Sequence, residues 1–402
     1  MAFPLVGDHA RTDGESTERS RQVVKLCVLT PVHWSAFKGG SEYQASLLID
    51  YLRTKYNVDA TYLTLAADRA VDRKSYRLVC FSSRTGIRRY GMFFDAFRLY
   101  RTLSRESPDV IYQQVGCAHT GIAAYYAKRN KCRMVWRVAS DNDVTKRPKD
   151  WLHPHVMLDH WFLEYGIRNA SVIITQTERQ RELLAANFDR SDAIVVRNFH
   201  PLPTESEIFE DAQPAKKIIA WIANIKPLKN PAAFIRLASR FADRSDLEFV
   251  MVGAGYARKG WLSDIAQMIN ETTNLRHLGE LSQTDVNKLL GRTHLLVNTS
   301  DYEGFSNTFI QAWMRGVPVV SLNVNPDGLL DGRTLGICSG TELQLYEDVS
   351  ALLADRARRR FMGERSRAFA AKEFSESNMD VIAQLLRLLP RANRRLVAHS
   401  SA

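Results

Sequence analysis

Residues 299–320 of the 402-residue chain read TSDYEGFSNTFIQAWMRGVPVV, and they follow a short apolar run at 294–298. The apolar run predicts a buried strand and the following residues an amphipathic helix, so Glu303 lies at a strand-to-helix junction. The free N–H groups in the first turn of a helix favour bound anions, typically phosphate. Glu303 and Gln311 are eight positions apart, about two helical turns, and both can face one ligand. A phosphate cradle beside a sugar-binding carboxylate is typical of a nucleotide-sugar site.

The same segment resembles the hallmark of the retaining glycosyltransferases of family 4, which is a glutamate, seven residues, a second glutamate and, further on, Gly-x-Pro. This chain follows the pattern from Glu303 to Pro318, with Gln311 at the position of the second glutamate. The resemblance implies that Glu303 orients the donor sugar and that Gln311 binds the ribose. Because glutamine keeps a carbonyl acceptor and adds donors, it can bind a hydroxyl without a charge. The resemblance also implies that the diphosphate is held by backbone amides around Gly304, Phe305, Ser306 and Asn307.

Length and composition indicate two globular domains. A chain of 402 residues exceeds the range over which a single hydrophobic core keeps growing, and its hydrophobic content of 45% is ordinary. The five cysteines are scattered and form no CxxC or Cys/His cluster, which argues against a disulfide scaffold and a zinc site. The first residues are too polar for a signal peptide, and no apolar span is long enough to cross a membrane. We therefore expect a cytoplasmic protein.

The chain is basic, with 55 lysines and arginines against 44 acidic residues and a net charge of +11. This balance favours an anionic partner, such as a nucleotide, a nucleic acid or an acidic membrane face, although a generally basic surface also explains it. No recognised module supports a nucleic acid. Residues 84–105 hold six arginines, and their apolar residues fit one helical stripe: Met92, Phe93, Ala96, Phe97, Tyr100 and Leu103. We expect the stripe to pack on its own sheet, which leaves the arginines for contact with an anionic membrane surface.

Two series of apolar runs alternate with helical patterns, which predicts parallel, doubly wound sheets. The first series predicts strands at Val24–Leu29, Ala60–Leu65, Leu78–Ser82, Asp109–Gln113, Met134–Val138, Val172–Thr175 and Ala193–Val196. A polar, proline-containing stretch interrupts the pattern after residue 200. The second series predicts strands at Ile218–Ile222, Glu248–Val252, Leu275–Leu278, Leu295–Asn298 and Val317–Ser321.

The family resemblance implies the GT-B architecture, in which two Rossmann-like α/β domains face each other across a cleft. We expect a disordered polar tail at 1–22 and an acceptor-side domain at 23–200. Residues 201–374 would form the domain that binds the nucleotide sugar. Residues 375–402 would contribute a helix that crosses back to the N-terminal domain, followed by a basic tail.

Two further loops carry candidate donor-binding residues. Gly39 and Gly40 lie between the first strand and the first helix, where glycine lets the backbone approach a phosphate or sugar closely. A tight turn with a helix cap is the alternative, but the family also has a Gly-Gly there, facing the donor. Lys229 matches the family's lysine at the start of the second domain and would place a charge on the diphosphate. Asn224 replaces the family's arginine, and Lys226 is close enough in sequence to compensate.

Three more positions complete the candidate site. Gly253 begins a Gly-Ala-Gly that resembles the family's Gly-x-Gly at a strand end, where a simple turn is the alternative. Family members often carry a histidine just after the fourth strand. Here Gln114 takes that place, and His119 at the next helix start would either line the cleft or merely cap the helix. Residues 141–143 form either an acceptor-side cluster or a turn.

Together these features predict a transferase that moves a sugar from a nucleotide-diphosphate donor to the hydroxyl of a carbohydrate or lipid-linked acceptor, with retention of the anomeric configuration. Glu303, Lys229 and His119 are the predicted catalytic residues. No metal-binding cluster is evident, so we expect metal-independent catalysis and no cofactor. One alternative is a nucleotide-sugar epimerase of similar fold. The other is an inactive sugar-nucleotide-binding protein, suggested by Asn224, Gln311 and the missing histidine.

Overall fold

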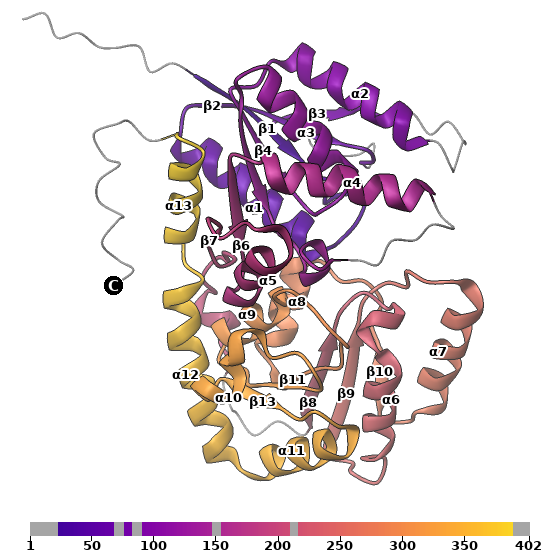
Figure 1. Cartoon of the computed structure of the whole chain (residues 1–402). Coiled ribbons are helices and arrows are strands. Elements are labelled where there is room, and N and C mark those ends of the chain that lie inside the picture. Colours follow the sequence, from indigo (N-terminus) through magenta and orange to yellow (C-terminus); the bar gives the residue numbers. More distant parts are fainter. Residues whose placement is uncertain (1–22, 68–75, 83–90, 147–153, 210–215, 389–402) are drawn as a thin grey trace, which may run out of the picture.

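The protein folds into two α/β halves, each built on a parallel sheet with helices on both faces (Figure 1). The computed structural model describes residues 23–67, 76–82, 91–146, 154–209 and 216–388. The predicted tail at 1–22, the arginines of 84–90 and the basic tail from 389 lie outside the described residues.

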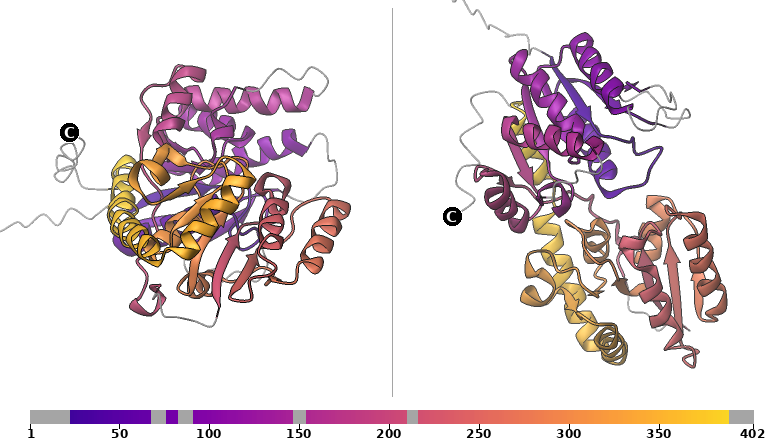
Figure 2. Two further views of the ribbon diagram at one scale, coloured as in Figure 1. Left: turned by 90° about the horizontal axis from the view of Figure 1, so that it is seen from below. Right: turned by 45° about the vertical axis from the view of Figure 1, so that its right-hand side comes forward.

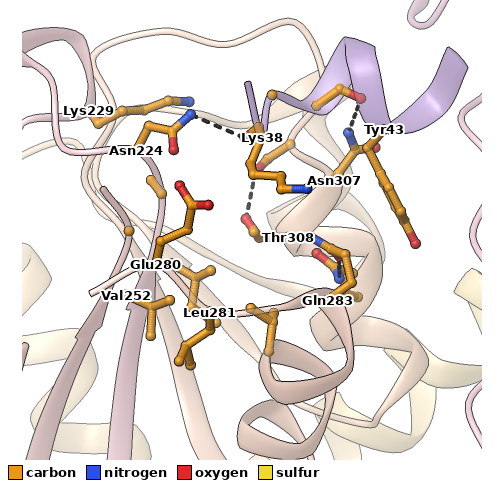
Figure 3. Close-up of a pocket in the computed structure, with 18 of the residues that line it drawn as sticks. Lys38, Tyr43, Asn224, Lys229, Val252, Glu280, Leu281, Gln283, Asn307 and Thr308 are labelled. Carbon is orange, nitrogen blue, oxygen red and sulfur yellow. Dashed lines mark hydrogen bonds between the residues drawn. The ribbon is translucent and has the colours of Figure 1, made fainter. Parts of the chain in front are cut away.

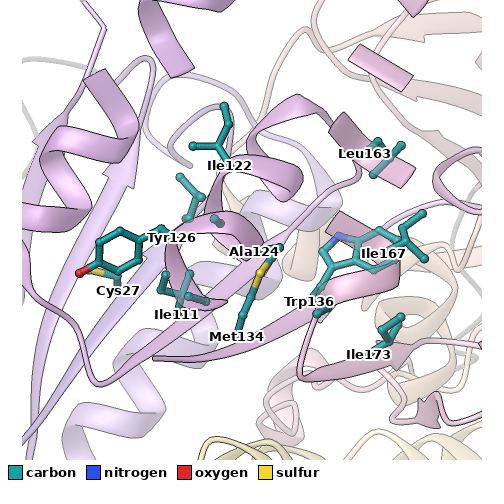
Figure 4. Packing of buried hydrophobic residues seen from close by; sticks show 14 of the residues in the cluster. Cys27, Ile111, Ile122, Ala124, Tyr126, Met134, Trp136, Leu163, Ile167 and Ile173 are labelled. Carbon is teal, nitrogen blue, oxygen red and sulfur yellow. The ribbon is translucent and has the colours of Figure 1, made fainter. Parts of the chain in front are cut away.

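The N-terminal sheet has seven strands in the described residues, which are β1 (Val24–Leu29), β2 (Val58–Thr64), β3 (Arg77–Cys80), β4 (Val110–Gln114), β5 (Arg133–Arg137), β6 (Val172–Thr175) and β7 (Ile194–Val195). They pair in parallel in the order β3-β2-β1-β4-β5-β6-β7. Its helices are α1 (Gly40–Lys55), α2 (Gly91–Glu106), α3 (Ala118–Arg129), α4 (Pro154–Asn169) and α5 (Glu178–Phe188). Every residue of β4 is buried, because helices cover both faces of the sheet. Figure 4 shows one of these layers, which contains Ile111, Trp136 and Ile167.

The C-terminal sheet has six strands in the described part of the chain, which are β8 (Lys217–Ile222), β9 (Leu247–Val252), β10 (Leu275–His277), β11 (Thr293–Asn298), β12 (Val319–Ser321) and β13 (Gly336–Cys338). They pair in parallel in the order β10-β9-β8-β11-β12-β13. The following helices accompany it: α6 (Pro231–Ser239), α7 (Lys259–Glu271), α8 (Gln283–Leu290), α9 (Asn307–Met314), α10 (Leu329–Arg333), α11 (Glu342–Ala354) and α12 (Arg356–Glu373). The predicted fold class, two Rossmann-like doubly wound parallel-sheet domains, is confirmed.

One strand of the second half is missing from the prediction. The short strand β13 is not among the predicted strands, although it pairs with β12 over three residues. Helix α9 is amphipathic, as the sequence predicts, with Asn307, Thr308 and Gln311 on one helical face. Its residues from Phe309 to Met314 are nevertheless all buried, because α12 also packs against it.

The predicted stripe on α2 is also wrong at one position. Phe97 is 67% exposed, whereas Leu99 and Leu103 are fully buried in the core beneath the helix. Residues 96, 99, 100 and 103 follow the spacing of one helical face, and Phe97 lies about 100° away from Ala96. Among the helices of the described residues, none combines the length and the apolarity that spanning a bilayer requires.

The chain passes twice between the two sheets. It crosses first through residues 198–204, and after α12 it returns to the N-terminal half as α13 (Ser377–Leu385), which packs against α1. The hydroxyls of Tyr51 and Tyr56 both donate to Asp380 Oδ1 of α13, at 2.6 and 2.9 Å. Figure 1 shows α12 and α13 in yellow along one side of both halves, and Figure 2 shows them from two further directions.

A buried histidine lies in the first crossing. His200 is 2% exposed, its backbone N–H donates to Phe374 O at 3.1 Å, and its Nδ1 lies 2.9 Å from Pro201 O. Burial lowers the pKa of His200 to about 4, chiefly because water no longer solvates the imidazolium. The imidazole is therefore neutral in the folded protein at pH 7.

This histidine predicts a loss of stability in mild acid. The unfolded chain takes up the proton near pH 6.5, whereas the folded chain resists it until about pH 4, so the folded state loses stability as the pH falls between these values. The loss from this group is about 3 kcal/mol. We expect the His200→Gln variant to lose less stability than the wild type between pH 6.5 and 4 in urea titrations. A matched His160→Gln variant should keep the wild-type slope, and identical slopes for all three proteins would contradict the prediction.

Candidate active site

The carboxyl ends of the two sheets face each other, and two adjoining pockets lie between them. Pocket A, about 180 Å³, is lined by Lys38 and Tyr43 of the N-terminal half and by Lys229, Glu280 and Gln283 of the other half (Figure 3). Pocket B, about 310 Å³, adjoins it and is lined by Glu42, Gln114, Asp143, Gln176, Asn198 and Lys226. Ligands of parallel α/β sheets bind at this edge, so the pockets are the candidate site.

Most of the residues predicted from the sequence lie around pocket A. Those outside the 299–320 segment are Gly39, Gly40, Asn224, Lys229 and Gly253. Those within it are Glu303, Phe305, Ser306, Asn307 and Gln311. Gly304 lines pocket B instead. The structure thus brings together loops that are more than 260 residues apart in the chain.

Thr299 holds the two central loops of the C-terminal sheet in place. Its hydroxyl lies 2.9 Å from Lys229 O and 2.8 Å from Asn230 O, and it accepts a hydrogen bond from Trp221 Nε1 at 2.9 Å. The loop after β11 is thereby fixed against the short 3₁₀ turn at Pro227–Lys229. This contact places the side chain of Lys229 beside Glu303.

Glu303 is held by three donors that all meet one of its oxygens. Oε1 lies 2.9 Å from Lys229 Nζ, and it accepts hydrogen bonds from Ser300 Oγ at 2.7 Å and from Asn298 Nδ2 at 2.9 Å. Burial acts to raise the pKa of Glu303, but the charge of Lys229 and these hydrogen bonds outweigh it and hold the pKa below its usual range. Among the described residues, no group bonds to Oε2. Glu303 is therefore an ionised carboxylate with one oxygen available to a ligand.

Lys226 adds a second positive charge at the junction of the pockets. Its ammonium group lies 6.0 Å from the centre of the Phe37 ring, and within the described residues no carboxylate reaches it at salt-bridge distance. Burial and the neighbouring Lys229 charge lower the pKa of Lys226. A half-buried cation that no carboxylate of the described residues pairs with directly favours an anionic ligand.

Gln311 is fixed by two neighbouring amides. Its Nε2 donates to Gln283 Oε1 at 2.9 Å and to Asn287 Oδ1 at 3.2 Å, both on α8. These bonds use both N–H groups of the amide, so the carbonyl oxygen is the group left to accept from a ligand hydroxyl. The predicted role of Gln311 at a ribose requires this acceptor.

Gly253 and Gly304 occupy positions that exclude a side chain. Gly253 has φ +144°, and a Cβ there would collide with Ala223 O. A Cβ on Gly304 would lie 2.7 Å from Gln180 Nε2 and 3.0 Å from Ala139 O, both in the N-terminal half. Glycine at 304 therefore permits the loop that carries Glu303 to approach the opposite sheet closely.

His119 does not line either pocket. It is 9% exposed, its ring packs edge to face against Phe81, and its Nδ1 lies 3.5 Å from Cys117 Sγ. Burial lowers the pKa of His119. The catalytic role of His119 therefore stays a prediction, and the side chain lines neither pocket.

Pocket B also contains Asp143, from the cluster predicted on the acceptor side, and Gln114, the residue at the place of the family's histidine. Glu42, Gln176 and Asn198 are polar lining residues outside the predicted set. Gln114 is fully buried, and its Nε2 has no hydrogen-bond partner among the residues that the structure describes. The next residue, Val115, has φ +77°, which is strained for a β-branched residue. Gln114 ends β4, and Gln176 directly follows β6. Ligands collect at the carboxyl ends of parallel strands, and this rule, applied to every predicted strand, could have found Gln176.

The comparisons with known proteins agree with this geometry. Residues 216–355, about a third of the chain, match the family model described as "Glycosyl transferases group 1". The chain is 29% identical over 109 residues to a 2-deoxystreptamine N-acetyl-D-glucosaminyltransferase of Niallia circulans, covering 27% of this chain and 28% of the relative. It is 29% identical over 168 residues to a D-inositol 3-phosphate glycosyltransferase of Nocardia farcinica, covering 39% and 37%. The chain thus spans well under half the length of these relatives.

Solved structures resemble almost the whole chain. The complex of Anabaena Alr3699/HepE with UDP and glucose has a TM-score of 0.72 at 16% identity, covering 91% of this chain and 100% of that one. WaaG, a glycosyltransferase involved in lipopolysaccharide biosynthesis, also has a TM-score of 0.72, at 12% identity, covering 90% and 99%. The fold is therefore GT-B, and the glycosyltransferase family model matches the half of the molecule that carries Lys229 and Glu303.

Proposed function

We propose that the protein is a retaining glycosyltransferase of family 4, which moves a sugar from a nucleotide-diphosphate donor to an acceptor hydroxyl in polysaccharide or glycolipid synthesis. The observation that carries the proposal is an ionised Glu303 beside Lys229 in pocket A, whose Oε2 has no partner in the described part of the chain. The relatives named above are glycosyltransferases, and the similar HepE binds UDP and glucose. The carboxylate can accept a hydrogen bond from a sugar hydroxyl, and the ammonium group of the lysine can pair with a phosphate.

The diphosphate would lie between Lys229 and the start of α9. Helix α9 begins at Asn307, so the free amides of its first turn would direct their partial positive charge at this place, and the amides of residues 304–306 would add to it. Lys226 lines the adjoining pocket B together with Lys229, and its positive charge would also act on the diphosphate. In the ligand-free protein Lys229 pairs with Glu303, and a bound diphosphate would compete for the lysine while Ser300 and Asn298 keep the carboxylate in position.

The same groups would stabilise the departing diphosphate. The bond from the anomeric carbon to the diphosphate oxygen breaks, and the acceptor oxygen forms the new bond on the same face of the sugar while its proton passes to the departing diphosphate oxygen. Negative charge grows on the leaving group, where fixed lysines and helix amides stabilise it most. Pocket B, with its carboxylates and amides, would receive the acceptor, and the site needs neither a metal nor a cofactor in this proposal.

The acceptor is a carbohydrate or a lipid-linked molecule in this proposal, and the protein works in the cytoplasm or at the inner face of a membrane. The exposed arginines of α2, Arg101 and Arg105, together with Phe97, would contact an anionic membrane surface. No role for nucleic acid is proposed.

The proposed function predicts which ligands stabilise the protein. We expect one class of sugar nucleotide, from a panel of UDP-, GDP- and ADP-sugars, to raise the thermal midpoint by mass action. At a hundred times its dissociation constant a ligand adds about 2.7 kcal/mol. The Lys229→Ala variant should lose this shift, whereas Lys259→Ala, on α7 and outside the lining of both pockets, should keep it. If no member of the panel shifts the wild type, the proposal is wrong.

Turnover of the donor separates the transferase from its alternatives. A transferase releases nucleoside diphosphate faster when an acceptor is added, whereas an epimerase converts the donor alone. An inactive binding protein, which the substitutions Asn224 and Gln311 would favour, shows the thermal shift but neither transfer nor hydrolysis.

Glu303 is expected to be essential for turnover. The Glu303→Gln variant keeps the size of the side chain but loses the charge, so we expect kcat to fall by at least about a hundredfold because the sugar is no longer held in place. Release of nucleoside diphosphate measures the loss. The matched Glu342→Gln variant, which removes only a surface ion pair with Arg236, should stay within twofold of the wild type. A fully active Glu303→Gln enzyme would refute the assigned role.

Lys226 is expected to supply the charge that the missing arginine supplies in the family. We expect Lys226→Ala to weaken binding of the nucleoside diphosphate about tenfold, as for the loss of one charged hydrogen bond, and Lys226→Arg to restore it. Because burial lowers the pKa of Lys226, the wild type should also lose affinity at high pH before the arginine variant does. Calorimetric titration measures both effects, and equal affinity of the wild type and Lys226→Ala would contradict them.

A further inference from the structure

Two asparagines of the C-terminal half hold the glycine loop of the N-terminal half, defined here as residues 38–40. Asn224 Nδ2 donates to Lys38 O at 3.2 Å, and Asn307 Nδ2 donates to Gly40 O at 3.0 Å. Both bonds reach backbone oxygens, so they depend on the position of the loop and not on its side chains. Figure 3 shows Asn224, Asn307 and Lys38 at the wall of pocket A.

Asn307 reaches further into the N-terminal half with its other atom. Its Oδ1 accepts from Asn198 Nδ2 at 2.9 Å and from Gln44 Nε2 at 3.2 Å. Gln44 and Asn198 are themselves buried and fixed, because Gln44 exchanges two hydrogen bonds with the backbone of Phe199 and Asn198 accepts from Arg137. The side chain of Asn307 thus docks onto a rigid part of the opposite half.

The glycine at position 40 is required by this contact. A Cβ on Gly40 would lie 2.6 Å from Asn307 Nδ2, and the other neighbour within 4 Å belongs to the same asparagine. Real Cβ atoms do not approach another heavy atom so closely, so a Cβ here would displace the movable amide of Asn307 and break its hydrogen bond to Gly40 O. The close approach at Gly40 and the hydrogen bonds of Asn307 are therefore two aspects of one interdomain contact.

We propose that Asn224 and Asn307 are positioning residues that clamp the glycine loop onto the C-terminal half, and that this clamp closes pocket A around the donor. In this role the side-chain amides hold the two halves together, whereas the sequence predicts a donor contact for Asn224 and a backbone contact with the diphosphate for Asn307. The identity of the ligand rests on the proposed function, but the closure of the two halves does not.

The clamp determines the fraction of molecules in which pocket A is closed and competent to bind the donor. When a binding-competent state is only partly populated, the apparent dissociation constant rises by the inverse of that fraction. Loss of the clamp would therefore raise the donor KM. At saturating donor the ligand itself would restore the closed state, so kcat would change little.

The test uses full-length Asn307→Ala, Gly40→Ala and the double variant, with Gly260→Ala as the matched control. Gly260 lies on α7 with nothing within 4 Å of its Cβ position. Small-angle X-ray scattering of the ligand-free proteins measures the radius of gyration. Kinetics with the sugar nucleotide that most stabilises the wild type gives KM and kcat, and thermal denaturation shows that each variant folds.

We expect both single variants to have a larger radius of gyration than the wild type, with KM raised about tenfold and kcat changed less than about threefold. The double variant should have a KM and a radius of gyration no larger than those of the more affected single variant, because both changes remove the same contact. Gly260→Ala should match the wild type. An unchanged radius of gyration, a fall in kcat without a rise in KM, or effects that multiply in the double variant would each overturn the proposal.

The scattering result does not depend on the enzyme activity. If no sugar nucleotide binds, the proposed function fails while the radii of gyration still test the clamp. If donors bind and turn over but the radii do not differ, the clamp fails and the proposed function stands.

Discussion

Three donors converge on one oxygen of Glu303, and the rest of the candidate site depends on this arrangement. A buried carboxylate is costly unless charged or polar groups surround it, and here Lys229, Ser300 and Asn298 supply them. They keep the group ionised and leave its second oxygen to a ligand. Because Lys229 and Ser300 come from loops after two different strands, the same interaction fixes the shape of the sheet edge on which pocket A is built.

The opposite half completes the site without contributing to this carboxylate network. The glycine loop at 38–40 covers pocket A, and the ends of β4, β5 and β6 line pocket B. The helix α13 and the buried crossing at 198–200 join the halves from the side. Because residues of both halves line pocket A, the shape of the pocket depends on the relative position of the two sheets.

The fold and most of the candidate site follow from local sequence patterns. Apolar runs spaced by helical segments predict both sheets, and residues placed just after predicted strands fall at one edge, which is why Lys229, Gly253 and Glu303 lie together. Contacts between the halves do not follow in this way. Asn307 and Gly40 are 267 positions apart, and no local pattern indicates that one fixes the other. His119 shows a further limit, since a position at a helix start does not tell where the side chain points.

A crystal structure of the wild type with the sugar nucleotide that stabilises it most tests the central claim directly. We expect the diphosphate between Lys229 and the amides of residues 304–307, with Glu303 Oε2 at a hydrogen-bond distance of about 2.6–3.2 Å from a hydroxyl of the sugar. A diphosphate bound elsewhere, or a sugar that does not touch Glu303, would contradict it.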